Sequence, residues 1–148
     1  MRAIVQRATR AEVRSGGRLL GKIGPGFVIL LGVGRGDTEA DADYILDRVL
    51  GMRVFADTAG KMNLALAAIG GALLVVSQFT LHAAVSQRRP SFTAAASPGE
   101  ALRLYEYFLS RARTSGVSVE SGEFGADMDL ELINDGPVTI ILDSRNRS

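Results

Sequence analysis

The sequence predicts one compact α/β domain over residues 1–148, in which part of the β structure packs against another layer of sheet. Three observations lead to this fold class. The length of 148 residues suits a single domain with a buried core. Hydrophobic residues make up 47% and charged residues 22%, which is typical of globular proteins and excludes a disordered chain. About eight strand patterns accompany only two helical patterns, so helices alone do not cover the strands.

The N-terminal half is predicted to contain mostly strands. Residues 2–7 and 10–14 have the pattern of two short strands, and a turn at 15–17 returns the chain as a hairpin partner over 18–23. The continuous apolar run at 27–31 is typical of a central strand that is covered on both faces.

The first helix is expected after this buried strand. Asp37 or Thr38 is suited to be its N-cap. Apolar side chains then recur at helical spacing, at Tyr44, Ile45, Val49 and Met52. A short strand is predicted over 52–55.

The C-terminal half begins with a second buried strand at 72–76, predicted to run on through the polar segment 77–81. The segment 97–100 combines an N-cap serine, a proline at N1 and a glutamate at N3, which predicts a capping box and a helix ending near Gly116.

Three further strands are predicted after this helix. One covers 117–121, one alternates between apolar and acidic residues over 127–132, and the last covers 138–142. The residues Asn-Asp-Gly-Pro at 134–137 favour a turn between the last two.

The net charge of +1 is unevenly distributed. Residues 1–36 carry seven basic residues against one acid, and residues 121–148 carry six acids against two arginines. A basic cluster can face phosphate groups, although a solvated hairpin face is the commoner outcome.

Several site chemistries are excluded by residue content. The chain has no cysteine, hence no disulfide, thiolate nucleophile or cysteine-bound zinc. It has one histidine, and the acidic residues of 127–131 have the pattern of one solvated strand face, so no metal site is expected. No apolar run approaches the ~20 residues of a membrane span. The start of the chain lacks an apolar signal segment, which predicts a cytoplasmic protein.

Two glycine patterns imitate nucleotide-binding motifs. Residues 16–22 have the glycine spacing of a P-loop, but Ile23 stands where a hydroxyl ligand of Mg²⁺ is needed. Residues 32–34 imitate a dinucleotide fingerprint, but Asp37 occupies the third glycine position and would repel a pyrophosphate. We expect neither site, and a capping role is the simpler expectation for Asp37.

The single histidine, His82, limits nucleophilic catalysis. A Ser-His-Asp triad would have to use it, and on a continuous strand His82 and Thr80 would share one face. A histidine at a strand end is more often structural or merely exposed. The sequence therefore offers no ordinary set of catalytic side chains.

Two segments carry a resemblance to a known family: SQFTL at 77–81 and NDGPVT at 134–139. With these segments the chain resembles the bacterial D-aminoacyl-tRNA deacylases, formerly called D-tyrosyl-tRNA deacylases. Further matching segments are QRAT (6–9), GKMNL (60–64), RPSF (89–92), LYEYF (104–108) and FGADM (124–128). Residues 82–88 lack the acid and the glycine usual in the family at this loop.

The resemblance implies a fold of mostly antiparallel, layered β-sheets (α/β/β layers) with two main helices on one side. It implies a cytoplasmic homodimer without cofactor, whose partner is aminoacyl-tRNA and not DNA or a membrane. The implied reaction hydrolyses the ester of D-aminoacyl-tRNAs such as D-Tyr-tRNA, and of glycine mischarged on tRNA(Ala). Catalysis would be assisted by the ribose 2′-hydroxyl of the substrate.

The resemblance also implies site residues. Those of the catalytic centre are Ser77, Gln78, Phe79 and Thr80. Gly136 and Pro137 would form a Gly-cisPro element, held by Arg7, which enters the partner subunit's pocket and rejects L-aminoacyl esters. Phe124 and Met128 would pack against the terminal adenosine. Considered without the resemblance, Ser77 and Thr80 could simply satisfy a strand end, and 135–137 could be only a turn.

Two other interpretations use the same sequence. One is a non-catalytic RNA-binding module in which the basic N-terminal hairpin and Arg88-Arg89 bind phosphates. The other is an ordinary esterase that uses Thr80 or Ser77 with His82.

Overall fold

The computed structural model describes residues 1–147. The strands are β1 (Arg2–Ser15), β2 (Arg18–Ile23), β3 (Gly26–Gly32), β4 (Phe55–Ala56), β5 (Met62–Leu64), β6 (Ala72–Ser77), β7 (Ser118–Ser121) and β8 (Asp129–Asp143). The α-helices are α1 (Glu39–Gly51) and α2 (Pro98–Thr114), and two short 3₁₀ helices are η1 (Leu66–Ile69) and η2 (Phe79–His82). No helix within residues 1–147 is long and apolar enough to cross a membrane.

One mixed sheet organises the molecule. Its strand order is β2-β1-β3-β6-β7. Strand β8 lies off this path and pairs with β1. The pairs that involve β1 are antiparallel, whereas β6 is parallel to β3 and to β7. The expectation of a mostly antiparallel α/β fold is confirmed.

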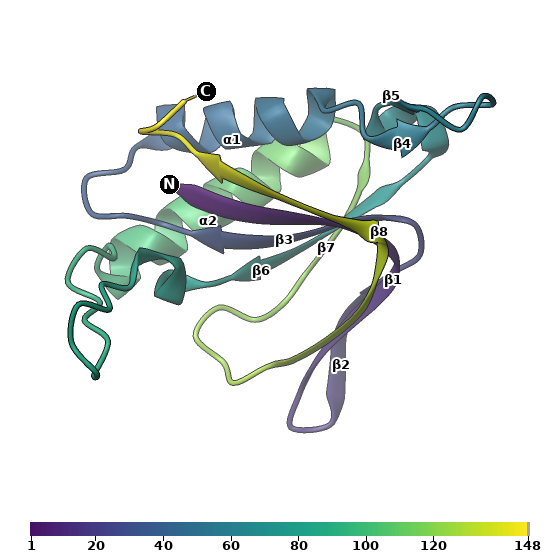
Figure 1. The fold of residues 1–148 in the computed structure, drawn as a ribbon. Helices are drawn as coiled ribbons and strands as arrows, with labels where there is room; N and C mark the ends of the chain where they lie inside the picture. Colours follow the sequence, from purple (N-terminus) through teal and green to yellow (C-terminus); the bar gives the residue numbers. More distant parts are fainter. Residues whose placement is uncertain (148) are drawn as a thin grey trace.

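Two apolar cores lie on opposite faces of this sheet. The larger one packs both helices against β1, β3 and β6, and Figure 1 shows α1 and α2 together on one side. The smaller one lies where β2 and the adjoining ends of β1 and β8 fold over the other face. Strand β3 serves both cores, since Phe27 and Ile29 face the helices and Val28 faces the second core. These are the predicted α/β/β layers.

Two predicted breaks are absent because β1 and β8 pair over nearly their whole length. Residues 2–7 and 10–14 belong to one strand, β1, rather than two. The expected turn at 134–137 lies inside β8, where the register against β1 shifts between Gln6 and Arg10. The extra residues are thus absorbed as an irregularity of the ladder, as in a β-bulge.

Other boundaries also differ from prediction. Strand β6 ends at Ser77, and the residues expected to continue it form η2 instead. Ser97 is the N-cap of α2 without a side-chain hydrogen bond, and Glu100 pairs with Arg103 at 3.0 Å, so the capping box is not formed. The strand expected at 52–55 is the two-residue β4.

Part of the basic N-terminal cluster is neutralised by acids of the C-terminal segment, because β1 and β8 are neighbours. Arg10 lies 3.4 Å from Glu131, and Arg2 and Arg7 also pair with acids of β8. Arg18 on β2 lies 3.4 Å from Glu123, whereas Arg14 pairs with Glu12 of its own strand. The hairpin is a solvated, charge-paired face, which disfavours the interpretation that it is a phosphate-binding edge.

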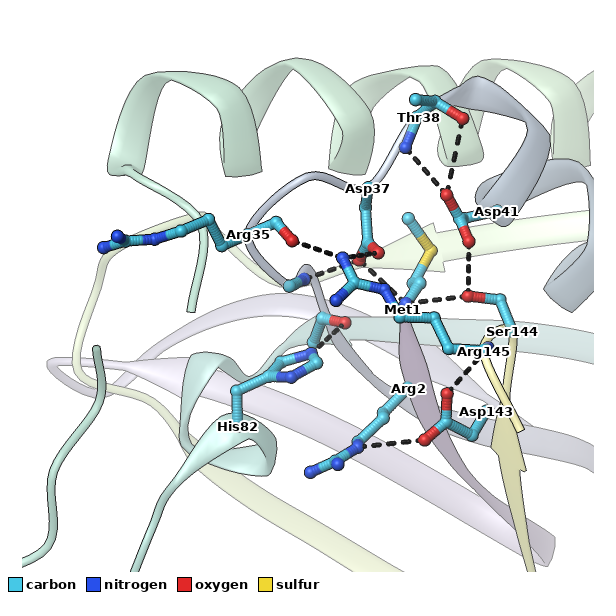
Figure 2. Close-up of polar contacts among 12 residues, drawn as sticks. Met1, Arg2, Arg35, Asp37, Thr38, Asp41, His82, Asp143, Ser144 and Arg145 are labelled. Atoms are coloured by element: carbon cyan, nitrogen blue, oxygen red, sulfur yellow. Dashed lines mark hydrogen bonds and ion pairs between the residues drawn. The ribbon is translucent and has the colours of Figure 1, made fainter. Parts of the chain in front are cut away.

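Asp37 has a structural role that differs from the expected cap. The N-cap of α1 is Thr38, and the Asp37 carboxylate is buried against the Met1 ammonium group at 2.8 Å (Figure 2). It also accepts hydrogen bonds from Gly34 N–H at 2.6 Å and from the Arg145 guanidinium at 2.8 Å. Because a buried carboxylate needs such partners, this network explains why an aspartate stands here.

Candidate active site

A cavity of about 340 Å³ opens where β6 ends and η2 begins. The end of β3, the segment 77–79, the loop before α2, the first turns of α2 and the segment 124–125 surround it. The lining residues are Leu31, Val33, Ser77, Gln78, Phe79, Phe92, Ala95, Ala96, Pro98, Ala101, Tyr105, Phe124 and Gly125. The cavity is mostly apolar, with a few polar groups at one end, as ligand sites commonly are.

Aromatic rings form two of its walls. Phe79 and Phe92 meet edge to face, with ring centroids 5.0 Å apart. Tyr105 and Phe124 form a second pair, with ring centroids 5.8 Å apart. Burial raises the pKa of Tyr105 to about 12, and its hydroxyl donates to the Val75 carbonyl at 2.8 Å. The phenol therefore stays protonated and is a structural donor, not a base.

A second hollow of about 270 Å³ adjoins the first. It shares Ser77, Gln78, Phe79 and Gly125 with the main cavity, and Met128 is among its other lining residues. Thus six of the nine predicted site residues gather around the end of β6: Ser77, Gln78, Phe79, Phe124 and Met128 line the two hollows, and Thr80 belongs to the adjoining η2.

Two backbone N–H groups at the start of η2 donate no hydrogen bond within this turn. Its first 3₁₀ hydrogen bond runs from Leu81 N–H to the Gln78 carbonyl at 3.2 Å. The N–H groups of Phe79 and Thr80 precede that bond, so the helical pattern gives them no acceptor. Phe79 lines both hollows, and Thr80 is the next residue of the same turn.

No carboxylate or histidine lines the main cavity beside the hydroxyls at this end, whereas Asp127 lines the second hollow together with Ser77. The Thr80 hydroxyl accepts a hydrogen bond from the Gln78 side chain. His82 is 8% exposed, and its Nε2 lies 3.0 Å from the Gly32 carbonyl oxygen, within the fold. Because η2 replaces the expected strand, Thr80 and His82 do not form the pair that the esterase interpretation needs. That alternative is not supported.

The remaining predicted residues lie away from both hollows. The Gly136-Pro137 peptide bond is cis, and Gly136 has φ +132°. Arg7 Nε donates to the Asp135 carbonyl at 2.9 Å, and Arg7 Nη1 donates to the Val54 carbonyl at 2.5 Å. Arg7 is thus hydrogen-bonded to the residue before Gly136.

The strand register shows how far apart the two groups of residues lie along the sheet. Arg7 aligns with Phe27, whereas Leu31 aligns with Ser77. Four residues of β3 separate these positions, which is about 13 Å of strand. Neither hollow is lined by Gly136 or Pro137. Within this chain, the Gly-Pro element does not line the cavity at the end of β6.

Sequence reasoning missed part of the cavity. Phe92 and Tyr105 lie within segments that carried the resemblance, yet they were not among the predicted site residues. The small residues Ala95, Ala96 and Ala101 carry no chemical signal at all. Within residues 1–147, no three His, Cys, Asp or Glu side chains are grouped as metal ligands would be.

Comparison with known proteins gives consistent matches over nearly the whole chain. A family model described as D-Tyr-tRNA(Tyr) deacylase matches residues 4–143. A D-aminoacyl-tRNA deacylase of Dehalococcoides mccartyi is 55% identical, covering 99% of this chain and 97% of that protein. A D-aminoacyl-tRNA deacylase of Symbiobacterium thermophilum is 54% identical, covering 97% of this chain and 96% of that protein.

Two solved structures share the fold. One, described as c-Myc DNA Unwinding Element Binding Protein, is 37% identical with a TM-score of 0.91, covering 97% of this chain and 98% of that chain. The other, described as a probable eukaryotic D-amino acid tRNA deacylase, is 17% identical with a TM-score of 0.81, covering 95% of this chain and 97% of that chain.

Proposed function

Because the chain belongs to the D-Tyr-tRNA(Tyr) deacylase family, we propose that it hydrolyses the ester between a D-amino acid, such as D-tyrosine, and the 3′-terminal adenosine of tRNA. The observation that carries the proposal is the aromatic cavity beside the uncommitted N–H groups of Phe79 and Thr80. The site is proposed to act without a cofactor, in the cytoplasm, on aminoacyl-tRNA and not on DNA.

The main cavity suits the terminal adenosine. A purine is planar and largely apolar on its faces, and such bases stack on aromatic side chains. The two aromatic pairs that line the cavity, Phe79 with Phe92 and Tyr105 with Phe124, offer such surfaces. The adenosine in this cavity would place its ester near Ser77 and Gln78, at the polar end of the same cavity.

The proposed chemistry is electrostatic and assisted by the substrate. When water attacks the ester carbonyl, the carbonyl oxygen gains negative charge, which the N–H groups of Phe79 and Thr80 would stabilise as an oxyanion hole. The proton of the attacking water needs an acceptor, and no carboxylate or histidine lines the main cavity. The neighbouring ribose 2′-hydroxyl would assist that water.

The proposed selection against L-aminoacyl esters acts by exclusion. Gly136 and Pro137 would enter the partner subunit's pocket and bring rigid backbone close to the substrate Cα. An L side chain would collide with it, whereas a D side chain points elsewhere. A glycyl ester has no side chain to collide, so glycine mischarged on tRNA(Ala) is proposed as a second substrate.

A homodimer is required by this arrangement, because one subunit keeps the two parts of the site apart. Exposed apolar side chains lie where a partner would cover them: Ile133 is 46% and Ile141 72% exposed on β8, and Phe79 is 56% exposed at the cavity. Burial of such side chains favours association. Light scattering at assay concentration should give twice the chain mass of 15.7 kDa. An active monomer would contradict the proposal.

Thr80→Ala is expected to retain at least about a third of the wild-type kcat, because the Thr80 residue is proposed to act through its backbone N–H. Loss of a true nucleophile removes several orders of magnitude. Steady-state hydrolysis of D-Tyr-tRNA by Thr80→Ala and by Ser77→Ala measures this. A loss of kcat by several orders of magnitude in a folded Thr80→Ala protein would instead indicate that the Thr80 hydroxyl is the nucleophile.

The function itself is tested with purified protein and tRNA charged with D- or L-tyrosine. We expect release of D-tyrosine under multiple turnover and no release of L-tyrosine above the spontaneous rate. Binding of charged tRNA without release of D-tyrosine would instead favour a non-catalytic RNA-binding module. Binding alone does not distinguish the two, since both bind phosphates.

A further inference from the structure

The end of β3 carries a glycine pair, Gly32 and Gly34, against which η2 packs closely. A Cβ on Gly32 would lie 2.8 Å from the Gln78 carbonyl oxygen and 3.0 Å from Leu81 Cβ. A Cβ on Gly34 would lie 2.8 Å from Cε1 of His82. Neither glycine has a positive φ in the left-handed region, so space rather than backbone conformation requires glycine here. The pair lets η2 and the imidazole sit directly on β3.

The imidazole of His82 is anchored as well as packed. Its Nε2 lies 3.0 Å from the Gly32 carbonyl oxygen, and His82 is 8% exposed (Figure 2). A carbonyl oxygen only accepts hydrogen bonds, so Nε2 carries the proton and donates it. This bond fixes the last residue of η2 to the last residue of β3.

Two other bonds hold the same turn. At its start, Gln78 N–H donates to the Leu31 carbonyl at 2.8 Å. Near its end, Arg2 Nη1 donates to the Leu81 carbonyl at 2.8 Å, and Arg2 Nε lies 3.2 Å from the Asp143 carboxylate. Of the three anchors, only the His82 bond is both buried and made by a side chain of η2 itself.

We propose that His82 is a positioning residue: its buried imidazole, seated against Gly32 and Gly34, fixes the turn that presents Phe79 and Thr80 to the cavity. His82 touches no substrate in this scheme. It acts because a displacement of about 1 Å in groups that contact a reacting centre can cost about 100-fold in rate. The buried histidine and the glycine pair thus act together to fix the position of η2.

The test compares variants that separate the hydrogen bond from the volume of the ring. His82→Phe keeps a ring but removes the donor, and is expected to lower kcat on D-Tyr-tRNA by about 10- to 100-fold with KM within about threefold. His82→Gln restores an N–H donor at similar reach and is expected to remain within about fivefold of wild type. Val85→Ala, at a 71% exposed position three residues on, is the control and should change kcat by less than about twofold.

A double-mutant cycle tests the contact with the glycine pair. Gly34→Ala is expected to lower kcat by about tenfold or more in the wild-type background, and by less than about twofold in the His82→Ala background, where the ring is absent. Equal effects of Gly34→Ala in both backgrounds would overturn the proposed joint role of His82 and the glycine pair. So would a folded His82→Phe protein with wild-type kcat, or a His82→Gln protein as slow as His82→Phe.

The kinetic measurements rest on the proposed hydrolysis. A second measurement tests the anchoring independently of any reaction. Amide hydrogen exchange of the peptide covering 77–83 should be faster in His82→Phe than in wild type, with peptides of α1 unchanged. Exchange that is unchanged in 77–83 would overturn the anchoring whatever the enzyme hydrolyses. If exchange of 77–83 is faster in His82→Phe but the wild-type protein does not hydrolyse D-Tyr-tRNA, the anchoring stands and the proposed function is rejected.

Discussion

Gly136→Ala is expected to reduce hydrolysis of D-Tyr-tRNA by at least about 100-fold while the protein still folds and forms its dimer. Gly136 has φ +132°, which L side chains rarely adopt. An added Cβ would lie 2.8 Å from Val138 Cγ2 and 3.0 Å from the Arg7 guanidinium. Arg7 holds the neighbouring Asp135 carbonyl, so the change displaces the element that is proposed to approach the substrate Cα.

The control for backbone strain is Gly60→Ala. Gly60 also has a positive φ, +78°, but an added Cβ there would meet nothing within 4 Å. This variant should lose stability but keep its kcat on D-Tyr-tRNA. Neither variant should gain activity on L-Tyr-tRNA, because crowding does not open the pocket. Wild-type rates from Gly136→Ala would leave the Gly136-Pro137 segment without a role in the site.

The second large effect is expected from the substrate. A tRNA that ends in 2′-deoxyadenosine and carries a 3′-D-tyrosyl ester should be hydrolysed about 1000-fold more slowly than the ribose form, because a positioned proton acceptor typically contributes 10²–10⁴-fold. No carboxylate or histidine lines the main cavity to take over that task.

The deoxy substrate should still bind, since the aromatic walls are proposed to contact the base and not the 2′ position. We therefore expect it to inhibit hydrolysis of the ribose substrate competitively, with an inhibition constant close to the KM of that substrate. Equal hydrolysis of both substrates would show that the protein supplies its own proton acceptor, and the search for one would begin with Asp127, which lines the second hollow.

The sequence predicted elements whose own residues decide their structure. The run at 27–31 is apolar at every position, and β3 is indeed covered on both faces. The first helix is predicted from apolar residues at helical spacing, and the second from the serine, proline and glutamate at its start. The family segments located the end of β6, where the cavity lies.

The errors arose where pairing between distant segments overrides local preference. Asn134 to Pro137 have the composition of a turn, but β1 pairs on both sides of them and carries the chain straight through. Residues 79–82 directly follow a buried strand and alternate between apolar and polar side chains, but η2 is held by His82 and Arg2 contacts that no local pattern reveals. Pairing between distant segments also offsets the uneven charge of the sequence, because basic residues of β1 lie beside acidic residues of β8.

The central claim is that a pocket built around Ser77 to Thr80 on one subunit is completed by Gly136 and Pro137 of the partner. Mixed dimers test it directly. One subunit carries Gly136→Ala, and the other carries Ala95→Trp, which fills the main cavity; each variant alone must be inactive. In the mixed dimer, the intact cavity of the first subunit faces the intact Gly136 of the second. We expect about half of the wild-type turnover per dimer. A mixed dimer no more active than its two parents would show that each subunit uses its own Gly136, and would contradict the account.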